Sequence, residues 1–130
     1  MWPESGGFLK RVATRERMKV SVYTHLEFER QFKRFKKKYH SLLDDFRTFL
    51  KEIKDNPLKG DDLGGGVRKI RMSVASKGGG KRGGMRVITY LLHQLNEDNI
   101  EVTLLYIYDK SEMSNVSEQF ISYLLKSICH

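Results

Sequence analysis

The sequence predicts an α+β domain with the element order β-α-α-β-β-β-α, a sandwich of a mostly antiparallel sheet and a helical pair. Two consecutive segments repeat their apolar residues at helical spacing, and later segments alternate or are rich in β-branched and aromatic residues, as strands are. A chain of 130 residues is long enough to bury one core without disulfides or a metal. We therefore expect one domain, with the helices laid across the sheet.

The chain begins with a segment that has no helical or strand period. Residues 1–17 are rich in glycine and charge, and we interpret them as an N-terminal extension, either disordered or created by a translation start assigned too far upstream. Met18 then opens the segment KVSVYT, which alternates like a short strand. We expect the domain itself to span residues 18–130.

Residues 25–39 and 41–53 predict an antiparallel pair of amphipathic helices. Aromatic residues recur at helical spacing in the first segment, with Lys and Arg between them. In the second, Ser41 is a candidate N-cap, and the pattern ends before Asn56-Pro57. Because the aromatic residues keep the helical period, we assign them to the core rather than to a base-stacking surface.

The remaining segments complete the sheet and add a closing helix. Residues 58–66 are interpreted as a polar connection, and residues 67–74 and 85–92 as two strands of a hairpin. Residues 101–108 are the most β-prone and are expected to form a central, buried strand. Residues 114–126 predict the helix. Its inward side chains are expected to be Val116, Phe120, Ile121, Leu124 and Leu125.

Positive charge is concentrated in one stretch. Between Val67 and Tyr90 there are seven Lys or Arg and no Asp or Glu. Strand alternation places Lys69 and Arg71 on one face, and a hairpin brings Arg86 to the same patch. Three cations on rigid strands could form a phosphate site. The alternative is a solvated surface, the usual place of Lys and Arg.

The composition narrows the class of partner. A net charge of +8 favours nucleic acid over a membrane surface, because no basic helix carries a dedicated apolar face for lipid. A single cysteine, Cys129, excludes a disulfide framework within the chain, and the four histidines show no metal-ligand spacing. We expect no metal or other cofactor. Without an apolar run of roughly 20 residues or a signal peptide, a cytoplasmic location is the default.

Four short motifs carry a family resemblance. KIR (residues 69–71), GKRGG (80–84), RVITY (86–90) and YDKSEMS (108–114) together resemble the RelE/ParE superfamily of bacterial toxins, above all its HigB-type members. The resemblance covers most of residues 18–126. It implies a RelE-like fold and a cytoplasmic toxin of a type II toxin–antitoxin system. The implied partner is a cognate antitoxin, expected to be a HigA-like helix-turn-helix protein.

The resemblance also implies an activity, the cleavage of mRNA in the ribosomal A site, and hence inhibition of translation. The catalytic cations of RelE-like toxins match four positions of this chain: Lys69, Arg71, Arg86 and Lys110. Some members have an arginine directly after that last lysine and a tyrosine in the final helix, where this chain has Ser111 and Ser117. The general acid and base therefore stay open.

Cleavage of RNA needs few protein groups. RNA supplies its own nucleophile, the 2′-hydroxyl, so the enzyme must orient it, remove its proton and stabilise the charge growing on phosphorus, without a metal. The guanidinium forks of Arg71 and Arg86 suit that charge. Lys69 is the best base candidate, because an arginine does not usefully deprotonate. The leaving group could take its proton from Lys110, Arg86 or the ribosome, and placement of mRNA by the ribosome would supply much of the rate.

Further residues are candidates for binding RNA or the ribosome. They come from the basic strands, the glycine-rich loop and the first helix: Arg68, Lys77, Lys81, Arg82, Tyr90, Lys33 and Lys37. Tyr90 could stack on an unpaired base or be buried, and the helical lysines could contact ribosomal RNA or face solvent.

Three other functions stay open. A ParE-like gyrase inhibitor would share the fold without ribonuclease chemistry, although the concentrated cations argue against it. A non-catalytic nucleic-acid-binding module would bind with a steep salt dependence and cleave nothing. A degenerate toxin would keep only its binding to the antitoxin, since Ser111 and Ser117 replace polar residues that are useful elsewhere in the superfamily.

Overall fold

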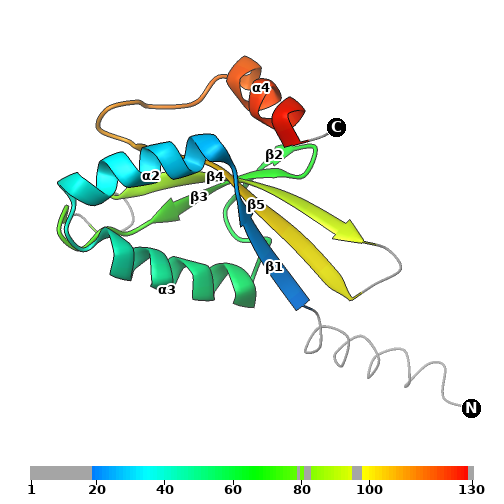
Figure 1. The fold of residues 1–130 in the computed structure, drawn as a ribbon, viewed down its shortest axis with the longest axis horizontal. Helices are drawn as coiled ribbons and strands as arrows, with labels where there is room; N and C mark the ends of the chain where they lie inside the picture. Colours follow the sequence, from blue (N-terminus) through cyan, green and yellow to red (C-terminus); the bar gives the residue numbers. More distant parts are fainter. Residues whose placement is uncertain (1–18, 79, 81–82, 95–97, 129–130) are drawn as a thin grey trace, which may run out of the picture.

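The computed structural model describes residues 19–78, 80, 83–94 and 98–128. Five strands in this part form one sheet in the order β1-β5-β4-β3-β2, and three helices pack on it (Figure 1). The strands are β1 (Lys19–Thr24), β2 (Asp61–Gly64), β3 (Val67–Met72), β4 (Met85–Gln94) and β5 (Asn99–Asp109). The helices are α2 (Leu26–Lys38), α3 (Leu42–Asp55) and α4 (Glu118–Ile128). Neighbouring strands are antiparallel, except that the edge strand β1 lies parallel to β5.

This architecture confirms the predicted α+β fold with a mostly antiparallel sheet. The predicted strand β5 is largely buried and lies inside the sheet, between β1 and β4, but the middle strand is β4. The interpretation of residues 58–66 as a connection without a strand is wrong, because β2 lies within it and pairs with β3. All four residues of β2 are exposed, and the sequence DDLG has low β propensity, so pairing with β3 defines this strand. The proposed extension, residues 1–17, lies outside the described residues.

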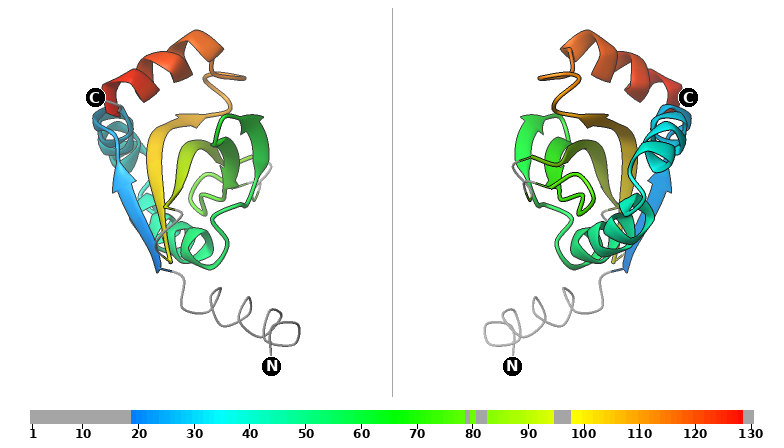
Figure 2. Two further views of the ribbon diagram at one scale, coloured as in Figure 1. Left: turned by 90° about the vertical axis from the view of Figure 1, so that its right-hand side faces the viewer. Right: turned by 90° about the vertical axis from the view of Figure 1, so that its left-hand side faces the viewer.

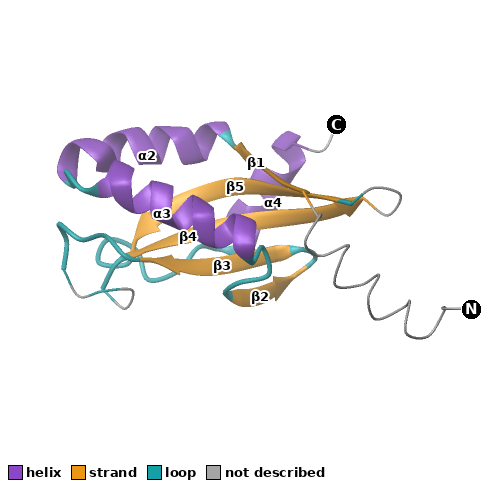
Figure 3. Ribbon diagram, turned by 90° about the horizontal axis from the view of Figure 1, so that it is seen from below, coloured by secondary structure: helices purple, strands orange, loops and turns teal. Residues whose placement is uncertain are grey.

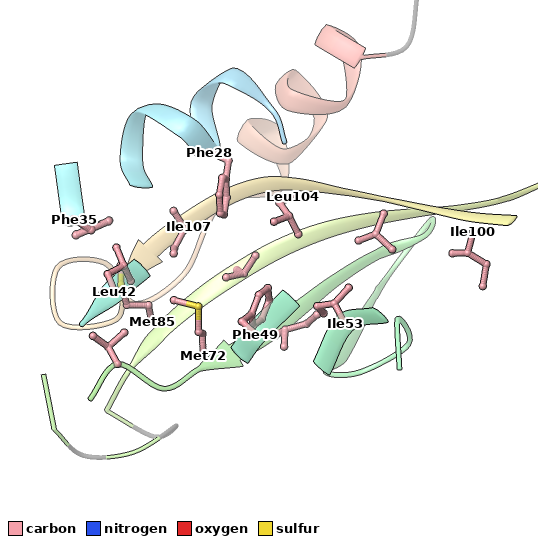
Figure 4. Packing of buried hydrophobic residues seen from close by; sticks show 14 residues of the cluster. Phe28, Phe35, Leu42, Phe49, Ile53, Met72, Met85, Ile100, Leu104 and Ile107 are labelled. Atoms are coloured by element: carbon pink, nitrogen blue, oxygen red, sulfur yellow. The ribbon is translucent and has the colours of Figure 1, made fainter. Parts of the chain in front are cut away.

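The helical pair covers one face of the sheet, with α2 and α3 antiparallel and side by side (Figures 1 and 3). His25 caps α2, since its Nδ1 accepts a hydrogen bond from the backbone N–H of Glu27 at 3.0 Å. Phe28, Phe35 and Phe49 are buried against the sheet (Figure 4), which confirms that the helical aromatic residues form core. We call the apolar layer between the sheet and the α2–α3 pair the helix-side core.

The last helix, α4, packs against the opposite face of the sheet (Figures 2 and 3). It begins later than predicted because Ser117 caps it: the Ser117 Oγ accepts a hydrogen bond from the Phe120 N–H at 3.1 Å. The predicted inward residues of this segment all join one cluster with Val67, Ile88, Leu105 and Tyr108. None of the helices in the described ranges is long and apolar enough to cross a membrane.

The turn before β2 requires glycine at position 60. Gly60 has a φ of +91°, and a Cβ there would meet the carbonyl oxygen of Lys69 and the side chain of Ile70. We predict that Gly60→Ala lowers the free energy of unfolding by about 1 to 3 kcal/mol, measured by urea denaturation. Gly64→Ala is the matched control, since Gly64 has a φ of +92° but open space around its Cα. Equal losses in the two variants would show that the close approach to β3 contributes nothing.

Candidate functional site

Three of the four cations on β3 and β4, namely Lys69, Arg71 and Arg86, share the face of the sheet that also carries α4. Ile70 and Met72 of β3 join the helix-side core, so Lys69 and Arg71 between and beside them point to the other face. Arg86 of β4 is the direct cross-strand partner of Arg71 and therefore faces the same way. The predicted pairing of these strands is confirmed, and we call their shared surface the basic face.

The first row of the basic face crosses three strands, from Arg71 on β3 to Arg86 on β4 and Tyr108 on β5. Arg71 is exposed, whereas Arg86 is only 4% and Tyr108 only 2% exposed. Burial lowers the pKa of Arg86, and the neighbouring cation of Arg71 lowers it further. Like charges directly opposite each other on paired strands are unfavourable. A bound anion would relieve this repulsion.

The second row runs from Asp61 on β2 through Lys69 and Ile88 to Tyr106 on β5. Asp61 is a site residue that sequence reasoning missed, because β2 was not predicted. Burial lowers the pKa of Arg86, whereas the nearby carboxylate of Asp61 raises it. A groove of about 380 Å³ opens at this edge of the sheet. It is lined by Lys59, Gly60, Asp61, Lys69, Ile70 and Arg71.

A β-bulge in β5 sets which aromatic residues reach the basic face. Ile88 of β4 pairs with Tyr106, and Thr89 pairs with Leu104, so Leu105 has no partner on β4. The extra residue allows Leu105 and Tyr106 both to join the cluster beneath α4. The bulge also places Tyr108, two residues further on, across from the buried arginine of the first row.

The remaining predicted catalytic cation, Lys110, lies in the turn after β5 and is exposed. It follows Tyr108 by two residues, at the end of the sheet where the first row lies, but it belongs to neither row. The structure thus brings together three of the four predicted catalytic cations and leaves the fourth, Lys110, in the turn that follows β5.

Two of the predicted RNA-binding cations are engaged within the protein. Arg68 donates hydrogen bonds to the carbonyl oxygens of Lys59 at 3.1 Å and Gly60 at 2.8 Å, and so fixes the turn before β2. Lys77 donates to the carbonyl oxygen of Gly83 at 2.6 Å, and its Nζ lies 3.4 Å from Asp109 Oδ1. Arg68 thus stabilises the turn before β2, and Lys77 stabilises the connection between β3 and β4.

The other predicted binding residues have different settings. Lys33 and Lys37 are exposed on α2. Tyr90 is half-buried and packs against the cluster beneath α4, so its ring contributes to the apolar packing on that face of the sheet. Lys81 and Arg82 lie outside the described residues.

Asp109, which is fully buried, joins three segments at the end of the sheet. Its carboxylate accepts hydrogen bonds from the Tyr39 hydroxyl at the end of α2 and from Ser111, through N–H at 2.9 Å and Oγ at 2.7 Å. Lys77 adds its cation from the loop between β3 and β4. Ser111, which departs from the family pattern, therefore has a structural role. The spacing Asp-x-Ser, typical of an Asx turn, was the available sequence signal.

The acid stability of the protein follows from this carboxylate. Burial alone would raise the pKa of Asp109, but the hydrogen bonds from Tyr39 and Ser111, with the Lys77 cation, hold it at about 2, below its ordinary value of 3.8. A lowered folded-state pKa stabilises the fold above pH 4, and this contribution disappears as the pH falls from about 4 to 2. We predict a loss of roughly 2 kcal/mol over this window in urea unfolding. The variant Asp109→Asn should lack this part of the pH dependence; identical pH profiles would contradict the assignment.

The two rows define what this surface can do chemically. An exposed arginine, a buried arginine and a lysine on neighbouring strands offer fixed donors to the oxygens of a phosphodiester. Among the residues that the structure describes, no three His, Cys, Asp or Glu side chains gather in a way that could hold a metal ion. The fold and its basic face define a small α+β protein with a cationic surface on its sheet.

Comparison with known families agrees with this class. The family model described as the RelE toxin of the RelE/RelB toxin–antitoxin system matches residues 25–127, which is most of the chain. The chain belongs to the RelE toxin family, and the predicted RelE/ParE membership is confirmed. A role as a toxin, with an antitoxin as partner, follows from this membership.

Proposed function

We propose that this toxin is a ribosome-dependent mRNA endoribonuclease that uses the 2′-hydroxyl of mRNA as its nucleophile. The observation that carries the proposal is the cross-strand pair of Arg71 and Arg86, one exposed and one buried, on a face with a concentrated positive charge. Two guanidinium groups fixed on adjacent strands are placed to bind the oxygens of one phosphate and to stabilise added negative charge in the transition state.

We assign a separate role in RNA cleavage to each polar residue of the basic face. Arg71 makes the first contact with the RNA backbone, and Arg86 stabilises the charge that develops on the scissile phosphate. Lys69 remains a general-base candidate, and Asp61, its cross-strand partner, adds a carboxylate with the same capacity. Lys110 remains a candidate proton donor to the leaving oxygen, together with Arg86 and the ribosome.

Dependence on the ribosome is supported by the distribution of charge on α2. Lys33 and Lys37 are exposed, whereas Arg34 and Lys38 are paired with Glu112 at 2.9 and 3.5 Å. We assign the exposed lysines to sequence-independent contacts with ribosomal RNA phosphates. The two rows of the site hold cations, one carboxylate and phenols. Positioning of mRNA by the ribosome then supplies the part of the cleavage rate that these groups do not.

The finer features of the toxin–antitoxin system belong to the same proposal. We assign the toxin to the HigB type on its GKRGG and YDKSEMS motifs. Its antitoxin is then HigA-like, and acidic segments of that partner neutralise the toxin by covering the basic face or by blocking entry to the ribosome. Both proteins would act in the cytoplasm, where ribosomes and mRNA are present.

Primer extension on mRNA tests the proposed activity. Purified toxin is added to translating ribosomes and, separately, to the same mRNA without ribosomes. We expect cuts at A-site codons in the first sample and intact mRNA in the second. Cuts in naked mRNA at the same rate would remove the ribosome from the mechanism. Intact mRNA in both samples, with toxin shown to be folded, would refute the ribonuclease.

The gyrase alternative has its own assay. A ParE-like inhibitor would block DNA supercoiling by purified gyrase and leave mRNA intact on ribosomes. The ribonuclease predicts the opposite pattern, with gyrase unaffected at toxin concentrations that cut mRNA. A protein that binds RNA with a steep salt dependence but affects neither substrate would be a non-catalytic binding module.

A further inference from the structure

The hydroxyl of Tyr108 makes no contribution to the stability of the fold that the described residues explain. The residue is only 2% exposed, and its hydroxyl has no hydrogen-bond partner among the residues that the structure describes. A buried hydroxyl without a partner destabilises a fold. The ring of Tyr108 packs in the apolar cluster beneath α4, and phenylalanine would fill the same space. The oxygen is therefore unexplained by packing or by strand pairing.

The position of Tyr108 points to a ligand. Arg86 lies directly across from it on β4, and Arg71 follows on β3, so the row holds two cations and one neutral O–H donor. All three groups donate hydrogen bonds, and an anion with several oxygens is the ligand that satisfies such a set. Arg86 and Tyr108 are direct cross-strand partners, and the Arg86 cation opposes the burial that raises the pKa of Tyr108.

We infer that the hydroxyl of Tyr108 donates a hydrogen bond to an oxygen of the RNA phosphate that Arg71 and Arg86 hold. The inference rests on the proposed function and adds a phosphate-contacting residue to it. Tyr108 and Arg86 are both buried in the free protein, so the exposed Arg71 engages RNA first. Side chains of the row then turn toward the phosphate, and the phenol gains an acceptor, which the described residues of the free protein do not provide.

Removal of one oxygen atom tests this inference. The variant Tyr108→Phe is compared with Tyr23→Phe, a control that also removes one phenol oxygen, from an exposed side chain on the edge strand β1 outside both rows. The probe is a short RNA with 2′-deoxy nucleotides at the cleavable positions, so that binding is measured without cleavage. Dissociation constants come from fluorescence anisotropy at low salt, and melting temperatures from circular dichroism.

We expect Tyr108→Phe to bind the probe about tenfold more weakly, because hydrogen bonds to charged groups are the strong ones. Its melting temperature should equal or exceed that of the wild type. Tyr23→Phe should bind within twofold of the wild type. Wild-type affinity in Tyr108→Phe, or a fall in affinity with a parallel fall in melting temperature, would overturn the inference.

The assay separates this inference from the proposed function. If the wild type cuts no mRNA on ribosomes while Tyr108→Phe still weakens binding of the probe, the ribonuclease fails and the phosphate contact stands. If the wild type cuts mRNA while Tyr108→Phe binds the probe as tightly as the wild type does, only the contact fails.

Discussion

Arg86→Ala is expected to reduce mRNA cleavage on ribosomes by a factor of about 100 to 1,000, the range typical for loss of one charge-stabilising donor. Arg86 is buried in the first row of the basic face, directly across from Arg71. In the proposed mechanism its charge is fixed where the scissile phosphate gains negative charge, in surroundings that screen it poorly. Single-turnover cleavage of mRNA held in ribosomal complexes measures this rate.

Two further variants make the result specific to the position and shape of the arginine. Arg86→Lys keeps the charge and loses the guanidinium fork, so it should cut more slowly than the wild type but faster than Arg86→Ala. Arg47→Ala also removes one positive charge, but from an exposed ion pair on α3, and should cut at the wild-type rate. A folded Arg86→Ala protein with full activity would remove this residue from the site.

Asp109→Ala is expected to cause the largest loss of stability, about 3 to 5 kcal/mol at pH 7. The substitution leaves the Tyr39 hydroxyl, the Ser111 donors and the Lys77 cation without their shared acceptor. These groups hold the end of α2, the turn after β5 and the loop between the basic strands. The free energy of unfolding from urea denaturation measures the effect.

A surface carboxylate serves as the control for this substitution. Asp44 forms an ion pair with Arg47 at 2.8 Å in which both side chains are largely exposed, so Asp44→Ala should leave stability almost unchanged. The double variant Asp109→Asn with Lys77→Met should lose less than the sum of its single substitutions, because a neutral pair leaves no buried charge unpaired. Strict additivity would mean that Lys77 and Asp109 do not interact.

The sequence was sufficient for those parts of the fold that follow a local period. The helical spacing of Phe28 and Phe35 placed them in the core, and strand alternation placed Lys69 and Arg71 on one face. Arg86 joined them through a hairpin whose two strands are close in sequence. In each case the pattern lies within one element or between adjacent elements, where geometry leaves few alternatives.

Features that depend on distant pairing could not be predicted. Asp61 became a site residue only because β2, which is short and exposed, pairs with β3. The alignment of Tyr108 with Arg86 depends on the register between β4 and β5 and on the bulge at Leu105. The hydrogen bond between Tyr39 and Asp109 joins residues 70 positions apart. Local periods contain no information on any of these.

The proposed attack by the 2′-hydroxyl is tested by changing this nucleophile in the mRNA and leaving the protein intact. Two mRNAs are placed with the same codon in the A site of ribosomal complexes, one all-ribose and one with a 2′-deoxy nucleotide on the 5′ side of the expected cut. The proposed mechanism predicts that the toxin cuts the ribose mRNA and leaves the deoxy mRNA whole at that position, since in-line attack requires the 2′-hydroxyl. Equal cutting of both, or no cutting of the ribose mRNA by folded toxin, would contradict it.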